Sequence, residues 1–426
     1  MATLNTYHLT DAVYRALLRT SAEETHKEIV LLESQLDGHP ESSATYLAAF
    51  PQKKLISKDG VSSWNEGSAS RTLHANPWSL LKKMRNESGW LFGYIGYDMK
   101  NYVESLSSLN RAYYNAPDLF MMEPSVLFRI ENGEIEQLLG DPIPIEKKQN
   151  EISRFKISNA APDISREEYI AAIREIKDMI REGDFYEMNF SYPFKAQFDG
   201  DPYGLYNRMR QINPVPFAGY LKLDNLSVCC SSPERFLKKS GEQLMSEPIK
   251  GTSGRHTDPR IDDQLKNELK NEKNEAENLM IVDLVRHDMS RVSKPGSIKV
   301  SKLYDIQTFG TVHQLISRVE GDMMAGIDPV DALKACFPMG SMTGAPKLRV
   351  IQEIDRLECY RRGIYSGSIG YFTPEGDFDF NVVIRSTVIQ GDTLTYPVGG
   401  AITGDSDPDE EWDETMVKAR VLTGAV

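Results

Sequence analysis

The chain has 426 residues, and its 62 acidic residues outnumber 49 basic ones, which gives a net charge of -13. Hydrophobic residues make up 40% of the sequence, as is typical of a globular protein with a substantial core. A chain this acidic has no general affinity for nucleic acid or an anionic membrane surface, because both require a basic face.

Targeting and membrane signals are missing from the sequence. No run approaches the roughly 18 uncharged apolar residues of a membrane-spanning helix. Residues 1–18 have neither the basic start nor the apolar centre of a secretory signal. The four cysteines form no CxxC pair, so reduced thiols are expected. These patterns predict a cytoplasmic protein.

The first 160 residues are expected to form helices over 11–19 and 78–84 and aromatic, glycine-punctuated strands over 90–97. A polar stretch follows, and then Ser165 and Glu168 have the spacing of a capping box. That box opens a predicted helix, which Gly183 is placed to end. We therefore divide the chain near residue 160, into an N-terminal segment, 1–160, and a second region, 161–426.

The second region alternates strand patterns with amphipathic helices. The predicted strands are 226–230, 298–300, 366–372, 380–387 and 393–397. Because these strands do not follow a regular βαβ order, the pattern favours an α+β fold with large antiparallel sheets.

Residues 274–288 are predicted to form a helix. Its central part, 279–285, is apolar except for Asp283, which predicts a helix that is buried on nearly all sides. Charged groups buried there, including Arg286 and Asp288, need partners because an isolated buried charge is very costly. An internal network of ion pairs would account for them without any catalytic role.

A second acidic segment, 409–414, precedes a helical pattern. Glu411 and Glu414 are three residues apart and would share a helix face, as a site for a hard cation requires. An acidic helix start that complements the helix dipole explains the same residues equally well. The sequence has no HExxH motif, EF-hand loop or Cys/His cluster, which disfavours zinc and dedicated calcium sites.

Three glycine-rich segments, 340–347, 367–371 and 399–405, are expected to be turns that could aim backbone N–H groups at an anion. None has the spacing of a Walker A or GxGxxG motif, so ATP and NAD are unsupported.

Lys250 lies between a strand-like segment and a glycine turn. It could be a desolvated nucleophile or an ordinary solvated charge.

Taken in order, several motifs resemble those of the chorismate-utilising enzyme family. They are SPERF at 232–236, PIKGT at 248–252, AENLMIVDL at 276–284, VH at 312–313, TGAPK at 343–347, IRS at 384–386, and ET with KA at 414–419. The resemblance covers roughly residues 165–426. It implies the family's α+β fold, a large sandwich of two mainly antiparallel β-sheets with helices packed outside.

The resemblance also implies a Mg2+ ion that holds the ring carboxylate of chorismate. Its ligands would be Glu277 and Glu414, with Glu411 supporting through water, because a dication relieves the repulsion between glutamates. Arginine suits the second carboxylate of chorismate, since its planar fork can bind both oxygens. The substrate-binding residues implied in this way are Tyr371, Arg385, Gly399, Gly400, Thr252 and Ser341.

Position 250 separates branches of the family. Anthranilate synthases usually have alanine there, whereas a lysine resembles the aminodeoxychorismate synthase branch, in which it attacks ring C2 as the C4 hydroxyl leaves. Ammonia from a glutamine amidotransferase partner would then enter at C4. Glu234 and His313 match residues placed for proton transfer. Because Lys250, Glu277, Arg385 and Glu414 occur together, an enzyme is favoured over a binding protein.

Three positions depart from the family pattern. Asn274 replaces a frequent acid, His287 replaces an asparagine, and Glu187 stands where amine-transferring relatives tend to have glutamine. Water-adding relatives have lysine at that last position. Residues 31–34, ending at Ser34, resemble the tryptophan pocket of anthranilate synthases. This keeps C2 amination with loss of pyruvate as the alternative activity.

Overall fold

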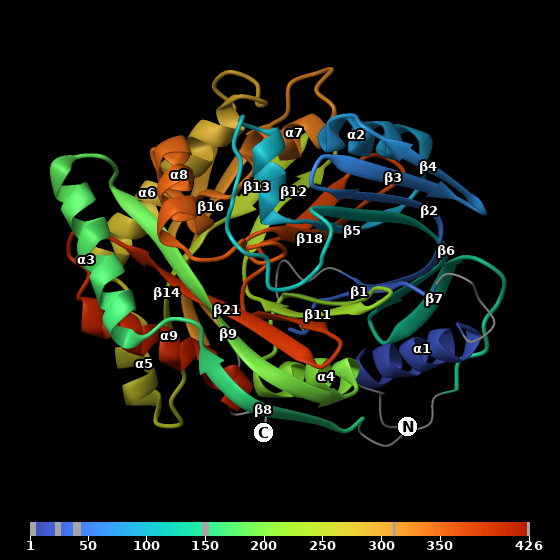
Figure 1. Ribbon diagram of the computed structural model, residues 1–426, viewed down its shortest axis with the longest axis horizontal. Helices are drawn as coiled ribbons and strands as arrows, with labels where there is room; N and C mark the ends of the chain where they lie inside the picture. The colour runs from blue at the N-terminus through green and yellow to red at the C-terminus, as the bar shows by residue number, and fades with distance from the viewer. Residues whose placement is uncertain (1–5, 22–26, 37–43, 147–152, 310–311, 424–426) are drawn as a thin grey trace.

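The computed structural model of the chain describes residues 6–21, 27–36, 44–146, 153–309 and 312–423. Strands fill the middle of the molecule, and helices cover its outer faces (Figure 1). No helix within these ranges is long and apolar enough to span a membrane. Part of the polar stretch predicted before residue 160, residues 147–152, lies outside the described residues.

The N-terminal elements are α1 (Thr6–Thr20), β1 (Ile29–Glu33), β2 (Thr45–Lys58), β3 (Val61–Glu66), β4 (Ala69–Leu73), α2 (Pro77–Glu87), β5 (Leu91–Ile95), the 3₁₀ helix η1 (Tyr97–Tyr102), β6 (Leu119–Glu131), β7 (Glu134–Leu139) and β8 (Phe155–Pro162). Next along the chain are α3 (Arg166–Glu182), β9 (Glu187–Gly200), α4 (Pro202–Ile212), β10 (Phe217–Lys222), β11 (Leu226–Ser232), β12 (Arg235–Ser240), β13 (Gln243–Glu247), β14 (Ile249–Gly254), α5 (Pro259–Glu268) and α6 (Glu272–Ser290). The last are β15 (Lys299–Thr308), β16 (Val312–Asp322), α7 (Pro329–Cys336), η2 (Gly340–Met342), β17 (Gly344–Ala345), α8 (Lys347–Leu357), β18 (Ser368–Phe372), β19 (Phe378–Asn381), β20 (Ser386–Gln390), β21 (Thr393–Ile402) and α9 (Pro408–Thr423).

These strands form one antiparallel ladder with two arms that diverge from the paired strands β2 and β6. One arm runs β2–β1–β10–β11–β20–β21–β9–β8. The other runs β6–β5–β18–β19–β12–β13–β16, and β16 also pairs with β14 and β15. Strands β1 and β5, from the first 160 residues, therefore pair with strands of the second region in both arms.

The two arms pack face to face. Buried residues of β1, β2, β5, β6, β10, β11 and β18 share one apolar core, which includes Val30, Phe92, Leu221 and Ile369. A second core joins the outer face of the β9–β21 arm to α1, α3, α4, α8 and α9, and a third joins the other arm to α2, α6 and α7. The expected sandwich with helices outside is confirmed by this layering.

Local signals located some elements correctly. Helix α3 has the predicted capping box, in which the Glu168 N–H donates to Ser165 Oγ at 3.1 Å and the Ser165 N–H donates to the Glu168 carboxylate at 2.8 Å. Gly183 ends the helix with φ 88°, in the left-handed region where glycine has no steric penalty.

Three expectations were wrong. The strand predicted over 380–387 is two strands, because the chain turns between β19 and β20 and Arg385 has φ 50°. Helix α6 is not buried all round, since Leu279 is 50% exposed and Asp283 pairs with Arg286 on the outside. Gly399 lies inside β21 and not in a turn, because this strand continues as far as Ile402.

Candidate active site

Lys250 and Glu187 form a buried ion pair between two strands. Lys250 Nζ donates to Glu187 Oε1 at 2.7 Å, and the two side chains are 10% and 2% exposed. Lys250 lies at an irregularity of β14, where the pairing with β16 shifts between Ile249 and Thr252, and Gly251 has φ 81°. This bulge turns the lysine from a regular ladder position, as bulges beside active sites commonly do.

Glu187 is the first residue of β9 and is held there by the short strand β17. Gly344 of β17 pairs with Met188, and a Cβ at Gly344 would lie 2.0 Å from the backbone oxygen of Glu187. Any other residue would push β17 away, and Gly344 also has φ 149°. The glycine of the TGAPK motif is therefore explained by close strand packing beside Glu187.

Glu234 is a buried acid in the loop between β11 and β12. Burial raises the pKa of Glu234 to about 7, while a hydrogen bond with Ser341 and the positive charge of Lys250 oppose the rise. A carboxyl with a pKa near 7 is half protonated at neutral pH and can therefore donate a proton. The position and environment of Glu234 suit a general acid.

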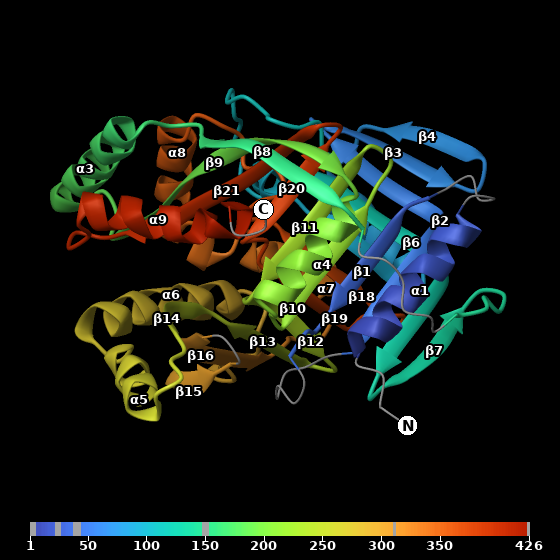
Figure 2. The same cartoon turned by 90° about the horizontal axis from the view of Figure 1, so that it is seen from below.

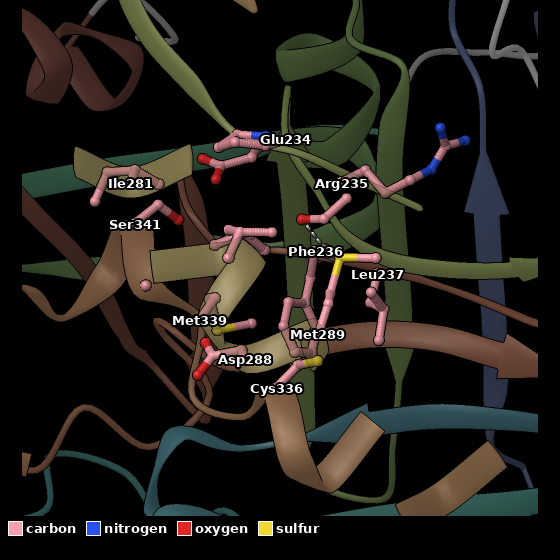
Figure 3. A pocket seen from close by; sticks show the side chains of 15 residues that line it. Glu234, Arg235, Phe236, Leu237, Ile281, Asp288, Met289, Cys336, Met339 and Ser341 are labelled. Carbon is pink, nitrogen blue, oxygen red and sulfur yellow. Dashed lines mark hydrogen bonds between the residues drawn. The ribbon is translucent and has the colours of Figure 1, made fainter. Parts of the chain in front are cut away.

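Glu234 and Ser341 line one end of a small cavity, with Asp288 and Cys336 at the other end (Figure 3). The cavity measures about 20 Å3, enough for about one water-sized molecule. Most of its lining is apolar, including Met289 from α6. The low polarity of this lining accounts for the strong effect of burial on Glu234.

Glu277 on α6 adds a third carboxylate beside Lys250. Burial raises the pKa of Glu277, Lys250 opposes the rise, and Glu187 adds to it. The Oε1 atom of Glu277 is buried and has no hydrogen-bond partner among the described residues. Burial lowers the pKa of Lys250, but Glu187, Glu277 and Glu234 together raise it above its ordinary value. The lysine is thus an ammonium group in the resting protein.

Glu411 and Glu414 lie on α9, which packs on β21. Glu411 is buried, accepts a hydrogen bond from Ser406 Oγ at 2.7 Å, and has its carboxylate 3.7 Å from Lys273 Nζ. Glu414 has a 58% exposed side chain and pairs with Lys418 at 2.7 Å. The charge of Lys418 lowers the pKa of Glu414, whereas burial raises that of Glu411. The two residues share a helix but differ in exposure.

Gly399 and Gly400 bring β21 close to both β9 and α9. A Cβ at Gly399 would lie 2.5 Å from the backbone oxygen of Phe190, and one at Gly400 would lie 3.2 Å from Glu411 Oε2. Lys418 Nζ donates to the Gly399 oxygen at 2.8 Å. The absence of a side chain at Gly400 therefore allows the Glu411 carboxylate to approach β21 closely, and Figure 2 shows β21 beside β9 and α9.

No three His, Cys, Asp or Glu side chains of the described residues form a ready-made metal cluster. Glu277 and Glu411 nevertheless influence one another, since the charge of Glu411 raises the pKa of Glu277. An orphaned buried Glu277 oxygen and mutually repelling carboxylates are what a hard dication would satisfy. The carboxylate oxygens of Glu277 and Glu411 are therefore of the chemical type that a magnesium ion binds.

Arg385 follows β19 in a left-handed conformation and its carbonyl accepts a hydrogen bond from the Ser231 N–H at 3.2 Å. Its positive charge acts on Tyr396, where burial raises the pKa to about 12 and Arg385 opposes the rise. Tyr396 is fully buried in β21, close to the two glycines. No sequence pattern distinguishes this tyrosine from the other tyrosines of the chain, which has 19.

Comparison with known proteins places these observations in a family. The chorismate binding enzyme family matches residues 27–424 of the chain. The chain belongs to this family. Aminodeoxychorismate synthase component 1 of Bacillus subtilis (strain 168) is 31% identical over an alignment of 439 positions, which covers 95% of this chain and 92% of that protein.

The chloroplastic aminodeoxychorismate synthase of Arabidopsis thaliana is 39% identical over 371 residues, which cover 79% of this chain. This chain spans only 40% of the length of that relative. The crystal structure of anthranilate synthase component I from Streptococcus pneumoniae TIGR4 superposes with a TM-score of 0.78 at 26% identity, over 91% of this chain and 93% of that one. The predicted family and fold class are thereby confirmed.

Within this chorismate binding enzyme, two predicted site residues lie apart from Lys250. Tyr371 contacts Tyr46, Trp90 and Phe92, and lines a separate cavity that also includes Glu33. Within the described residues, no hydrogen bond or ring contact links Tyr371 to Arg385, and their shared role at one carboxylate stays a prediction.

His313 is the second of these residues. Its Nδ1 lies 2.9 Å from Thr308 Oγ1 and its Nε2 lies 3.1 Å from Asp262 Oδ1, so both ring nitrogens are engaged with groups other than Glu234 and Lys250. Thr252, paired with Gln314 on β16, is exposed at the edge of the bulge. The directions of the His313 and Thr252 side chains thus depend on how β14 and β16 pair, which the sequence motifs do not specify.

The departures from the family pattern have different surroundings. Asn274 Nδ2 donates to the Leu269 oxygen at 3.0 Å, and the same amide nitrogen lies 3.0 Å from where a Gly251 Cβ would be. This asparagine therefore braces the bulge that carries Lys250. His287 is on the exposed face of α6, 3.5 Å from Arg291. Glu187, in contrast, directly contacts Lys250.

Proposed function

We propose that the chain aminates chorismate at C4 to give 4-amino-4-deoxychorismate, with ammonia supplied by a glutamine amidotransferase partner. The observation that supports this proposal most directly is that the Lys250 amine lies in a buried cluster with Glu234, an acid whose pKa is raised to about 7. A nucleophile and a proton donor in one desolvated site are what covalent displacement of a hydroxyl requires. The names of the Bacillus subtilis and Arabidopsis thaliana relatives support this activity.

Substrate binding would use the charged groups at both ends of the cluster. A Mg2+ ion held by Glu277, Glu411 and Glu414 would supply positive charge for the ring carboxylate of chorismate. Arg385 would receive the second carboxylate, since a planar guanidinium can contact both oxygens. Gly399 and Gly400 have no side chains, so no side chain projects from β21 at these two positions.

In the first chemical step, the Lys250 amine attacks ring C2 and forms a C–N bond. The ring double bonds shift toward C4, and the C–O bond at C4 breaks. Glu234 donates its proton to the departing hydroxyl, which leaves as water. The product of this step is a secondary ammonium that joins Lys250 to the ring.

In the second step, ammonia attacks C4 and the double bonds return to their first positions. The C2–N bond breaks, and Lys250 leaves as a neutral amine because it was bound as an ammonium. The new C4 ammonium then returns one proton to the Glu234 carboxylate. Atoms and charges balance, with chorismate and ammonia converted to the amine and water.

C2 amination is the second candidate, because the similar Streptococcus pneumoniae structure is an anthranilate synthase component I. That reaction expels pyruvate and gives an aromatic product directly. Lys250 favours C4 amination because, at this position, it supplies a nucleophile for C2 that would block entry of ammonia there.

Product identity tests the proposal. The purified chain is incubated with chorismate, Mg2+ and ammonium, with and without an added aminodeoxychorismate lyase, and the products are separated. We expect 4-aminobenzoate only when the lyase is present. Fluorescent 2-aminobenzoate formed without lyase would instead establish C2 amination, and unchanged chorismate would overturn both activities. Adding glutamine with a candidate amidotransferase then tests the partner.

A further inference from the structure

The resting state of Lys250 raises a question that the proposed reaction leaves open. An amine attacks carbon only in its neutral form, but Lys250 Nζ is engaged as an ammonium in a buried ion pair with Glu187. Some group must therefore take a proton from Nζ before the C–N bond forms. Because the side chain is 10% exposed, bulk water has little access to it.

Geometry identifies Glu187 as the group in contact with that proton. Its Oε1 accepts the hydrogen bond from Nζ at 2.7 Å, and no other hydrogen bond of Nζ is present in the described part of the chain. The other nearby acids have other tasks in the proposed reaction, since Glu234 donates a proton and Glu277 binds the metal. Glu187 is also 1% exposed, so its proton would not be lost to solvent.

The second oxygen of Glu187 is unusual. Oε2 is buried and has no hydrogen-bond partner among the described residues. A structural ion pair would normally have both carboxylate oxygens satisfied. Glu187 instead keeps one unused acceptor atom beside the Lys250 ammonium, which is the geometry of a carboxylate that can receive a proton.

We propose that Glu187 is the proton acceptor that activates Lys250, an inference that rests on the proposed C4 amination. One Nζ proton passes to Glu187 Oε1, which leaves a neutral amine beside a neutral carboxylic acid. The amine then attacks C2. After ammonia has displaced it, the released amine takes the proton back from Glu187. The proton is returned in each cycle, so no further co-reactant is needed.

Glu187→Gln tests this role, because the amide can still accept a hydrogen bond from Nζ but cannot accept its proton. We expect turnover at neutral pH to fall by about 10²-fold, the usual contribution of a positioned general base. Turnover of the variant relative to the wild type should then rise with pH, because the free amine must form without Glu187. Glu187→Asp, which keeps a carboxylate, should recover part of the activity.

A second readout separates proton transfer from simple loss of an ion pair. The pH dependence of Lys250 labelling by trinitrobenzenesulfonate, followed by mass spectrometry of the intact chain, reports its free-amine fraction. In Glu187→Gln the labelling pKa should fall, because one raising carboxylate is gone. The rise in turnover relative to the wild type should follow that labelling pKa. A more reactive lysine combined with slower turnover is not expected of a merely structural residue.

Asp377→Asn is the matched control. It removes the carboxylate from another lysine pair, in which Lys239 Nζ donates to Asp377 at 2.8 Å outside the cluster. Its turnover should equal that of the wild type. A Glu187→Gln variant with wild-type turnover at neutral pH would overturn the role of Glu187 while leaving the proposed function intact. A wild-type chain that forms no C4 amine would overturn the proposed function itself.

Discussion

Two buried ion pairs in this molecule differ in how fully their hydrogen-bonding atoms are used. Arg362 donates from Nε and Nη2 to Glu358 at 2.8 and 2.6 Å, and also to the backbone oxygens of Met342 and Asn189. Glu358 Oε1 further accepts both the N–H and the hydroxyl of Ser191 at 2.8 Å. In the Lys250–Glu187 pair, by contrast, one carboxylate oxygen has no partner.

The difference separates a structural pair from a reactive one. Arg362 links η2 to β9 through its hydrogen bonds to Met342 and Asn189. These bonds hold the Arg362–Glu358 pair in one arrangement. An arginine also stays charged, whereas a lysine can lose its proton when its surroundings change. The Glu187 carboxylate therefore keeps an unused acceptor atom beside Lys250, whereas both oxygens of Glu358 are used.

The largest effect on activity is expected from Lys250→Ala. The variant should lose C4 amination by roughly 10³-fold or more, because the nucleophile is gone and not merely misplaced. Intact-mass analysis during turnover should detect a chorismate-derived adduct on the wild type and none on the variant. Full activity in the variant would show that the Lys250–Glu187 pair is only structural, like the Arg362–Glu358 pair.

The largest effect on stability is expected from Arg362→Met. Removing one member of a buried pair leaves the other charge unpaired, which costs about 3 to 5 kcal/mol in the free energy of unfolding. Urea unfolding followed by circular dichroism measures this loss. Arg181→Met, which removes an exposed pair with Asp178, should cost less than about 1 kcal/mol. Equal losses in the two variants would remove the distinction drawn here.

The pH dependence of turnover should reveal Glu234. Its pKa is raised to about 7, so the acid is protonated below that pH and ionised above it. Turnover should therefore fall as pH rises through about 7. Glu234→Gln should lower the neutral-pH rate by about 10²-fold and abolish this basic limb. A wild-type profile without a basic limb would argue against the general-acid role.

The smallest effect is expected at the position that the motif favoured but the structure sets apart. Tyr371→Phe should leave the KM for chorismate unchanged, because the phenol lies in the separate aromatic cavity. Arg385 was predicted to bind the same carboxylate as Tyr371. The Arg385→Lys substitution should raise the KM for chorismate by about tenfold, because lysine keeps the charge but loses the planar fork. Steady-state kinetics at fixed Mg2+ distinguishes them, and a raised KM in Tyr371→Phe would restore its predicted role.

Much of the fold and part of the site could be predicted from local patterns. The capping box at Ser165 and the stop at Gly183 depend on neighbours within one turn, so they were located correctly. Lys250, Glu234 and Ser341 were selected by motif and do lie in one cluster. Their assigned roles remain predictions that the variants above test.

Other features could not be predicted because they depend on distant strands. The break at Arg385 follows from where β19 and β20 find their partners, and hydrophobic alternation does not encode it. The His313 side chain points toward Asp262 of α5, and this direction is set by the packing of α5 against β14. Gly344 looked like an anion-binding turn but is needed for the approach of β17 to Glu187.

The sequence by itself determined the family, the net negative charge, the two ends of helix α3 and the residue types available for chemistry. Each of these depends on composition or on residues close together in the chain. Only the tertiary structure decided that Glu187 contacts Lys250 and that Tyr371 belongs to another cavity. Such contacts join residues far apart in sequence, and they depend on strand register and bulges, which side-chain patterns along one segment do not specify.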